Sequence, residues 1–270
     1  MNRIGILRGR FDPLTERELE YAKNLRRQYR LDLLILKAEG EGVLGLSERE
    51  ALLKQALYPY RRLVCGNDVS GAVIDAVCEE MDEEAVRTGS FRLAAQGIRK
   101  ALVEKGYYLD AVLDHQCKAS RAAHSRAVAD LCREIAEAVG EDAELAWRTG
   151  MLHDITKNRP EEWGRRILEV HDPLLLAMSP KVWHASTAVV WLQQEMGICD
   201  RRMLNAIRNH TLGLGKGVLD RILYVADKCE RTRGYDAEKE IALTKQSPAA
   251  GAALVYEESA KYRMNKGEVK

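Results

Sequence analysis

An imidazole and a carboxylate stand side by side at His153-Asp154, within the otherwise apolar stretch 151–157. Unpaired ionisable groups are costly to bury on the apolar face of a helix. A bound metal ion would compensate both groups, because neutral imidazole and carboxylate are common ligands of transition metals. The pair therefore predicts a metal centre.

Four further residues are expected to converge on this pair. Each recurs at helical spacing with aliphatic residues, which places it on the buried face of a predicted helix. These residues are His124, His184, His210 and Asp227. A single histidine on an apolar face is more often a satisfied core residue than a ligand. Several separate helices that each offer such a residue favour a shared site instead.

The predicted ligand set contains four imidazoles and two carboxylates. This set suits iron, manganese, cobalt or zinc better than magnesium, which prefers oxygen ligands. Six ligands are too many for one catalytic metal with an open position, so two ions that share Asp154 are the expected arrangement. Such a centre supplies an activated water for attack on phosphorus, and the sequence therefore predicts a phosphate-cleaving hydrolase.

Several polar residues near the predicted ligands are candidates for substrate contacts. Lys157, one turn beyond His153, is the first candidate for a phosphate contact, with Arg208 and Arg233 behind it. Thr211 follows a predicted ligand and would hydrogen-bond a phosphate or the attacking water. Ordinary surface charge is an equally good explanation of the two arginines.

The elements that must position these residues divide the chain into two predicted domains. Residues 1–118 alternate short apolar runs, at 3–7, 31–36 and 62–65, with helical patterns, which is typical of an α/β, Rossmann-like sheet. Residues 119–270 have almost purely helical patterns and predict an all-α domain. The length of 270 residues allows each domain a core of its own.

Composition restricts the class of partner. The 42 Lys and Arg residues nearly balance the 41 Asp and Glu residues, so general attraction to nucleic acid or to a membrane surface is not expected. No apolar run approaches the roughly 20 residues that span a bilayer. The six cysteines include no Cys-x-x-Cys pair, and nothing resembles a signal peptide. We expect a cytoplasmic protein that acts on a small molecule; a homodimer is left open.

The second half resembles the YqeK type of HD-domain phosphohydrolases, the bacterial symmetrical diadenosine tetraphosphate hydrolases. Four motifs occur in that family's order: Leu-His-Asp-Ile-Thr-Lys at 152–157, Trp-His-Ala at 183–185, Ala-Ile-Arg-Asn-His-Thr-Leu-Gly at 206–213 and Tyr-Val-Ala-Asp-Lys-Cys-Glu at 224–230. The resemblance implies an HD-domain helical bundle, a centre of two iron ions, and cleavage of the substrate into two ADP molecules. Arg231 stands where the type usually has proline.

The first half resembles the nucleotidyltransferases that include the nicotinate-mononucleotide and phosphopantetheine adenylyltransferases. The residues that carry this resemblance are Gly9, Phe11, Asp12, Thr15 and Arg99. In that family the loop and the following helix N-terminus hold nucleotide phosphates. Here Arg17 replaces the family's glycine and Glu18 its final histidine, so a carboxylate stands where phosphate would bind. The resemblance implies a shortened nucleotidyltransferase fold that no longer transfers.

Three alternatives remain open from the sequence. The helical domain would hydrolyse another nucleotide or phosphate ester, the whole chain would be a nucleotide-binding regulator without turnover, or the first domain would still join a nucleotide to a small acceptor. The motif at 9–14 has a simpler explanation as well, as a turn after a strand.

Overall fold

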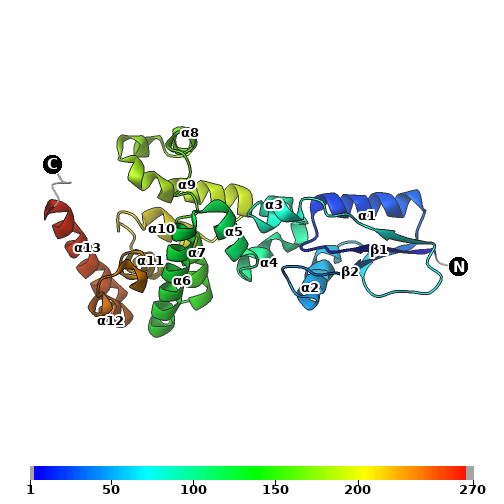
Figure 1. Cartoon of the computed structure of the whole chain (residues 1–270), viewed down its shortest axis with the longest axis horizontal. Coiled ribbons are helices and arrows are strands. Elements are labelled where there is room, and N and C mark those ends of the chain that lie inside the picture. Colours follow the sequence, from blue (N-terminus) through cyan, green and yellow to red (C-terminus); the bar gives the residue numbers. More distant parts are fainter. Residues whose placement is uncertain (1–2, 266–270) are drawn as a thin grey trace. The chain divides into compact units, whose positions relative to one another are not determined.

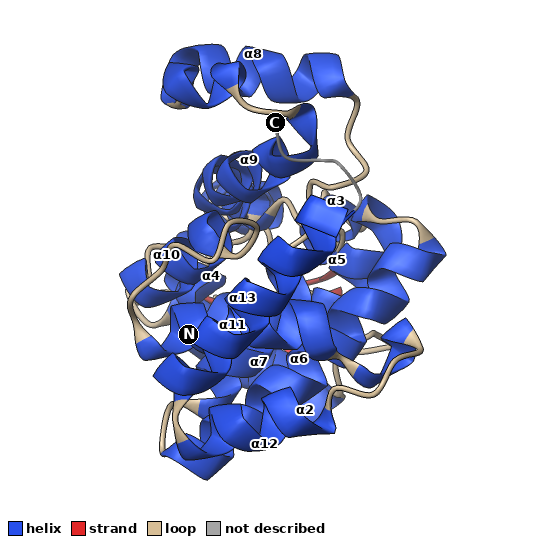
Figure 2. Cartoon of the chain, turned by 90° about the vertical axis from the view of Figure 1, so that its left-hand side faces the viewer, coloured by secondary structure: helices blue, strands red, loops and turns tan. Residues whose placement is uncertain are grey.

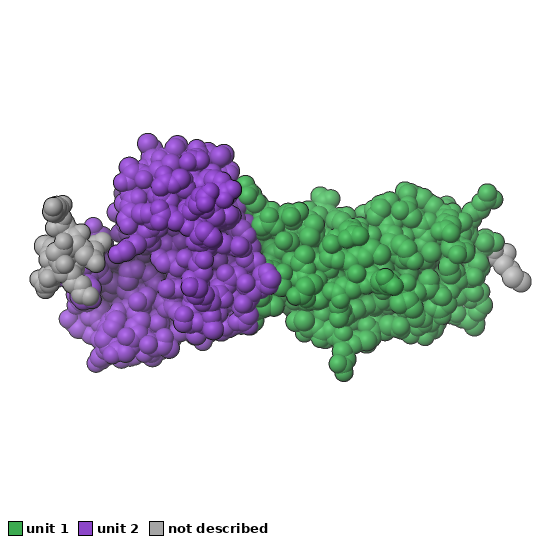
Figure 3. Space-filling view, turned by 45° about the horizontal axis from the view of Figure 1, so that its top comes forward, with its two compact units in different colours: residues 1–112, 194–197 green, residues 113–193, 198–270 purple. Residues whose placement is uncertain are grey.

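The computed structural model describes residues 3–265 and divides into two compact units, coloured separately in Figure 3. Unit 1 comprises residues 1–112 together with 194–197, and unit 2 comprises residues 113–193 and 198–270. The division falls between Val112 and Leu113, inside helix α5 (Leu109–Gln116), a few residues before the predicted boundary at 118.

Unit 1 is built around a four-stranded parallel sheet of order β3-β2-β1-β4. Its strands are β1 (Ile4–Gly9), β2 (Leu33–Ala38), β3 (Leu63–Cys65) and β4 (Ile74–Val77). The helices α1 (Glu16–Gln28) and α2 (Leu46–Leu57) lie on opposite faces of the sheet (Figure 1). The two central strands are covered on both faces, which explains their continuous apolar sequences.

The alternation of strands and helices predicted for the first half is confirmed, and two details differ from the prediction. The strand β4 was not expected, because its sequence alternates half-buried and exposed residues instead of forming an apolar run. The residues Ser47 and Glu50 have the form of a capping box, but α2 begins after Gly45, and Glu48 accepts from the backbone N–H of Gly45 instead. Two short helices, α3 (Glu83–Arg87) and α4 (Arg99–Glu104), complete the unit before α5.

Unit 2 is helical throughout its described residues, as Figure 2 shows. Its helices are α6 (Ala119–Val139), α7 (Ala143–Leu152), α8 (Glu161–His171), α9 (Trp183–Trp191), α10 (Arg201–Asn209), α11 (Val218–Cys229), α12 (Glu238–Gln246) and α13 (Pro248–Asn265). No helix within residues 3–265 is both long enough and apolar enough to cross a membrane.

The close approach of α6 and α7 depends on Gly150. A Cβ atom at this position would lie 2.5 Å from the Cα atom of Ala129, a distance that side chains do not tolerate. The absence of a side chain therefore lets the two helix backbones come together. This packing brings the helix that carries His124 next to the helix that ends at His153.

The helix α7 ends earlier than its sequence pattern suggested. The apolar stretch at 151–157 favours a helix that continues to about Lys157, but α7 ends at Leu152 and His153 is its C-cap. Consecutive residues inside a helix point about 100° apart, so a continuous helix would separate adjacent side chains. His153 and Asp154 follow this helix end directly and are both buried, at 0% and 3% exposure.

Candidate metal centre

The end of α7 fixes the orientation of His153. The last carbonyl groups of a helix have no intrahelical partner, and one of them, that of Gly150, accepts a hydrogen bond from His153 Nδ1 over 2.7 Å. The imidazole is thereby held with Nε2 on its other side. Among the described residues, this fully buried Nε2 has no hydrogen-bond partner.

His210 repeats this arrangement at the end of α10. It is the C-cap of that helix, and its Nδ1 donates to the carbonyl of Ile207 over 2.6 Å. The His210 ring centroid lies 5.1 Å from that of His153 and 5.2 Å from that of His184. Two helix ends therefore present imidazole Nε2 atoms to one buried space.

His124 and Asp227 meet on the side formed by α6 and α11. Nε2 of His124 lies 3.1 Å from a carboxylate oxygen of Asp227, and its Nδ1 lies 3.1 Å from Glu230. The same Asp227 oxygen is 3.8 Å from Nε2 of His153. Glu230 thus orients His124, just as helix-end carbonyl groups orient His153 and His210. A metal-ligating imidazole usually has such an acceptor at its other nitrogen.

Asp154 lies between these histidines. Its Oδ2 accepts from Arg121 over 2.7 Å, whereas its buried Oδ1 has no oriented hydrogen-bond donor among the described residues. Nε2 of His184 lies 2.9 Å from this oxygen and Nε2 of His210 lies 3.5 Å from it. The carboxylate therefore faces imidazoles on the side opposite its arginine partner.

Two groups of potential ligand atoms fit a metal ion, and they share one residue. Within each group the atoms lie within 4.8 Å of one another. The first group is His124, His153 and Asp154, and the second is Asp154, His184 and His210. Two of the buried atoms that lack hydrogen-bond partners, Nε2 of His153 and Oδ1 of Asp154, belong to these groups. A buried imidazole nitrogen and a buried carboxylate oxygen without partners are what a bound metal ion would satisfy, so this set of residues fits a metal centre.

The protonation states of His153, His184 and Asp154 favour metal binding. Burial lowers the pKa of His153 to about 4, so its imidazole is neutral near pH 7 and has a free lone pair. Burial also lowers the pKa of His184. Burial by itself would raise the pKa of Asp154, but the nearby His153 and His184 imidazoles hold it well below its usual range. The cluster therefore combines neutral imidazoles with an ionised carboxylate.

Lys157 lies against the same cluster. Its Nζ is 3.0 Å from Nδ1 of His184 and 3.2 Å from Nε2, and it also donates to the carbonyl of Lys181. Burial lowers the pKa of Lys157. Lys157 and His184 both line a pocket of about 220 Å³ that also contains Trp163 and Trp183. This pocket, here named the lysine pocket, opens directly onto the cluster.

The other predicted substrate contacts lie at different places. Arg233 donates to Asp227 over 3.0 Å and therefore lies at the edge of the cluster. Arg208 instead lies 3.4 Å from Asp172 and 3.4 Å from the hydroxyl of Ser186. Thr211 follows His210 directly and is partly exposed. The structure thus brings Lys157 and Arg233 to the ligands but pairs Arg208 elsewhere.

Two residues of the cluster were missed from the sequence. Arg121 holds Asp154, and Glu230 holds His124. Arg121 precedes His124 by three residues on α6, and Glu230 follows Asp227 by three at the end of α11. Spacing by three places residues on the same helix face, and this was the available signal.

The residues of the predicted nucleotide site in unit 1 are occupied by contacts within the chain. Phe11 is 1% exposed, and a Cβ atom on Gly9 would lie 2.8 Å from its ring. Asp12 is fully buried and accepts from the backbone N–H groups of Val43 and Leu44 and from the hydroxyl of Tyr108.

The helix N-terminus beside these residues is also satisfied internally. Thr15 caps α1 and accepts from the N–H of Glu18, while the Glu18 carboxylate accepts from the N–H of Thr15 over 2.9 Å. Arg99 donates to the carbonyl of Ala94 and to the carboxylate of Glu16. The N–H of Thr15 and the guanidinium of Arg99, which a nucleotide phosphate would use, are therefore already engaged by carboxylates of the chain.

Comparison with known proteins agrees with the helical geometry. A family model described as HD domain matches residues 121–232, a range that contains all six predicted ligands. The chain is 34% identical to the symmetrical bis(5′-nucleosyl)-tetraphosphatase of Bacillus subtilis over 134 residues, which are 48% of this chain and 72% of that protein. It therefore belongs to the family of HD-domain proteins that contains this enzyme.

Two more distant relatives extend the comparison. A probable nicotinate-nucleotide adenylyltransferase/Ap4A hydrolase of Mycoplasma genitalium is 32% identical over 127 residues, which cover 47% of this chain but only 36% of that protein. A solved structure of a predicted HD superfamily hydrolase involved in NAD metabolism, from Clostridium acetobutylicum, has a TM-score of 0.54 at 24% identity and covers 59% of this chain and 87% of that one. The structural likeness supports the fold.

Proposed function

We propose that unit 2 binds two metal ions and hydrolyses diadenosine tetraphosphate symmetrically into two ADP molecules. The observation that carries this proposal is the sharing of Asp154 between the two groups of ligand atoms. The bacterial relative named a symmetrical bis(5′-nucleosyl)-tetraphosphatase supports the choice of substrate. Iron is the first choice of metal, with manganese, cobalt and zinc as alternatives that suit the same ligands.

The ligands of each ion are taken from the two groups, with Asp227 added because its carboxylate lies 3.1 Å from Nε2 of His124. His124, His153 and Asp227 would hold one ion, His184 and His210 the other, and Asp154 would bridge them. When bound, two ions supply a low-pKa water as the nucleophile and a Lewis acid for the phosphate oxygens. The protein's part is to orient the imidazoles, which the hydrogen bonds from Nδ1 to Gly150, Ile207 and Glu230 do, while burial lowers the pKa of His153.

The charged residues around the cluster contribute to substrate binding. Lys157 lines the lysine pocket and presents its ammonium group beside His184, where it would neutralise a phosphate oxygen. Arg233 lies on Asp227 and is the second phosphate contact that we propose. Arg208, paired with Asp172, would have to release that partner before it reached a phosphate. Thr211 would donate a hydrogen bond to a phosphate or to the attacking water.

For unit 1, we propose a nucleotidyltransferase-like fold without transferase activity. The strand order supports this fold, because strands 3-2-1-4 are the first part of the order found in dinucleotide-binding sheets. The carboxyl group of Glu18, at the N-terminus of α1, supports the loss of activity, since it accepts from the backbone N–H groups of Thr15 and Met81 and so fills the place of an anionic ligand. Residues 1–118 and 119–270 are the proposed limits of the two domains.

One assay tests the hydrolase proposal. Purified full-length protein is analysed for bound metal by mass spectrometry and incubated with diadenosine tetraphosphate, and the products are separated by chromatography. Two ADP molecules per substrate are expected, with loss of activity on chelation and recovery on adding metal. AMP together with ATP would refute symmetrical cleavage. Metal binding without turnover would instead indicate a regulatory protein.

A further inference from the structure

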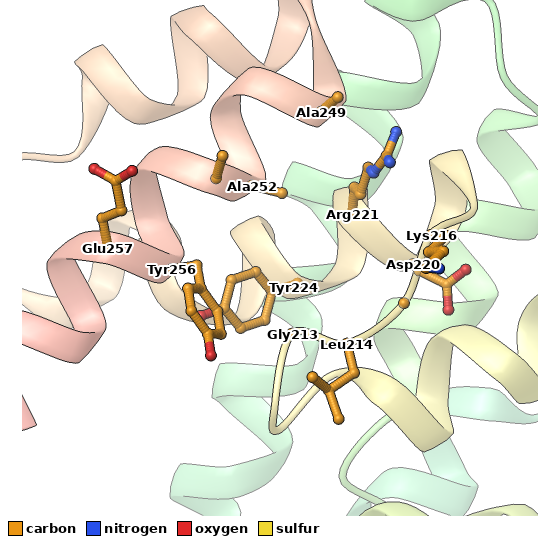
Figure 4. Close-up of a pocket in the computed structure, with 12 residues that line it drawn as sticks. Gly213, Leu214, Lys216, Asp220, Arg221, Tyr224, Ala249, Ala252, Tyr256 and Glu257 are labelled. Carbon is orange, nitrogen blue, oxygen red and sulfur yellow. The ribbon is translucent and has the colours of Figure 1, made fainter. Parts of the chain in front are cut away.

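A second pocket in unit 2 lies beyond the lysine pocket and the metal ligands. It has a volume of about 400 Å³, within the range of about 300–1,000 Å³ that is usual for small-molecule sites. Figure 4 shows its walls: α13 contributes Ala252 and Tyr256, α11 contributes Arg221 and Tyr224, and the loop after α10 contributes Gly213. We name it the tyrosine pocket.

The aromatic residues of this pocket differ in burial. Tyr224 is 4% exposed, and its ring is the surface that a Cβ atom on Gly213 would strike at 2.8 Å. Tyr256 is 43% exposed although it lines the cavity. Small residues, among them Ala249 and Ala252, leave the opposite wall open. A partly exposed aromatic ring beside small residues offers a stacking face for a flat ligand.

The cations of the pocket have no acidic partner. Arg221 is half-buried and Lys216 is exposed, and neither forms an ion pair with any residue between 3 and 265. Two acidic residues also line the pocket: Asp220 already accepts from Asn209 and from the N–H of Gly217, and Glu257 is exposed on α13. A stacking face beside unpaired cations suits a ligand that combines an aromatic base with an anionic chain, which is the chemistry of a nucleotide.

The position of the pocket connects it to the metal ligands. Arg221, Tyr224 and Asp227 follow one another at intervals of three on α11, so they lie along one face and each step rises about 4.5 Å. Lys228, whose Nζ lies 5.4 Å from the Tyr224 ring centroid, also donates to Asp227. The loop that contains Gly213 starts from the ligand His210. Two of the chain segments that line the pocket therefore lead directly to proposed ligands, His210 and Asp227.

We infer that the tyrosine pocket binds the second nucleoside of the dinucleotide substrate while the first nucleoside occupies the lysine pocket. Tyr256 stacks on the base, and Arg221 and Lys216 contact the phosphate chain that leads back to the ligands. The inference rests on the proposed function, because symmetrical cleavage places the reacting phosphate at the middle of the substrate. Each nucleoside then needs its own pocket at a similar distance.

Steady-state kinetics of metal-loaded protein test this assignment. Tyr256→Ala and Arg221→Ala are each expected to raise KM for diadenosine tetraphosphate about tenfold, which corresponds to about 1.4 kcal/mol, and to change kcat less than twofold. Tyr262→Ala, farther along α13, and Arg201→Ala, on α10, are the matched controls and should leave KM unchanged. An unchanged KM in both pocket variants overturns the inference even when the wild type hydrolyses normally.

A binding experiment separates the pocket from the reaction. Photolabelling with 8-azido-ADP, followed by peptide mapping, is expected to label the segments that contain Tyr224 and Tyr256, and excess ADP should protect them. Labelling there without any hydrolysis would retain the nucleotide pocket and refute the proposed function. Hydrolysis with labelling only around the lysine pocket would retain the function and refute the second nucleoside site.

Discussion

Two aspartates, Asp12 in unit 1 and Asp154 in unit 2, are almost completely buried in opposite surroundings. Asp12 receives three hydrogen bonds from Val43, Leu44 and Tyr108. Asp154 has one arginine partner, and its other oxygen faces imidazoles without an oriented donor. A buried carboxylate whose two oxygens both accept hydrogen bonds stabilises the fold. A buried carboxylate with an oxygen that accepts none can bind a cation. Satisfaction of hydrogen bonds, more than burial, separates a structural acid from a metal ligand.

The largest expected effect is that of Asp154→Asn. Replacing the shared carboxylate by a neutral amide removes a ligand from both proposed ions, so we expect bound metal to fall sharply and hydrolysis of diadenosine tetraphosphate to be lost. The free energy of unfolding of the metal-free protein should fall, because the neutral amide no longer pairs with Arg121 and the folded protein holds the pKa of Asp154 well below its usual range. Metal analysis, product chromatography and chemical denaturation measure these quantities. Retained activity would refute the assigned bridge.

The matching substitution in unit 1, Asp12→Asn, is expected to destabilise the fold and to leave hydrolysis nearly unchanged. The amide nitrogen cannot accept a hydrogen bond, so at least one donor among its partners is left unsatisfied, at a cost of about 1–3 kcal/mol. Hydrogen exchange should become faster in β1 and α1, while kcat for the tetraphosphate stays within about twofold of the wild-type value. A large loss of hydrolysis with unchanged exchange would contradict the structural role of Asp12.

A smaller effect is expected at Glu230, which orients a ligand without being counted as one. Glu230→Gln keeps an acceptor for His124 Nδ1 but removes its charge, and such substitutions behind metal ligands typically cost about 10–100-fold in metal affinity or activity. Metal titration of the purified variant measures the affinity. Glu238→Gln is the control, because that carboxylate is exposed and pairs with Arg231. Equal affinities in the two variants would leave Glu230 without a positioning role.

The same contrast shows what could be predicted from the sequence. Residue type and helical spacing identified the histidines and aspartates of unit 2, because buried ionisable residues are unusual wherever they lie. The end of α7 at Leu152 could not be predicted, since the apolar pattern continues beyond it and the turn is set by packing around His153. The contacts from Arg121 and Glu230 required the tertiary arrangement of α6 and α11.

Unit 1 limits prediction in a different way. The motif at 9–18 showed that Glu18 replaces a family histidine, but not that its carboxyl group would cap α1 and also accept from the N–H of Met81. The tyrosine pocket likewise depends on α13 packing against α11, and no local pattern in either helix encodes that contact. In both units the sequence indicated which residues carry the chemistry, but it did not indicate which residues they contact in the fold.

The smallest effect concerns the one carboxyl pair of unit 1 that is not fully satisfied. Glu18 and Glu83 are each 1% exposed, and Oε1 of Glu83 lacks a partner when both groups are ionised. Burial and then the charge of Glu83 raise the pKa of Glu18 to about 8 from 4.5. A proton kept on Glu18 at neutral pH would supply the missing donor to Glu83. This shared proton, together with Arg10 and Arg87, which pair with the other oxygen of Glu83, accounts for the burial of both acids.

Stability measured against pH tests this explanation. Because the folded-state pKa of Glu18 is raised, the folded protein binds more protons than the unfolded chain between about pH 4.5 and pH 8, so this group's contribution to the free energy of unfolding is fully present at low pH and is lost as the pH rises through 8. At about 1.4 kcal/mol per pKa unit, the contribution is at most a few kcal/mol. Glu18→Gln cannot titrate, so the difference between wild type and variant should change steadily across this window. A difference that does not vary with pH would mean that Glu18 is ionised in the folded protein, and unit 1 would then contain an open carboxylate of the kind found at Asp154.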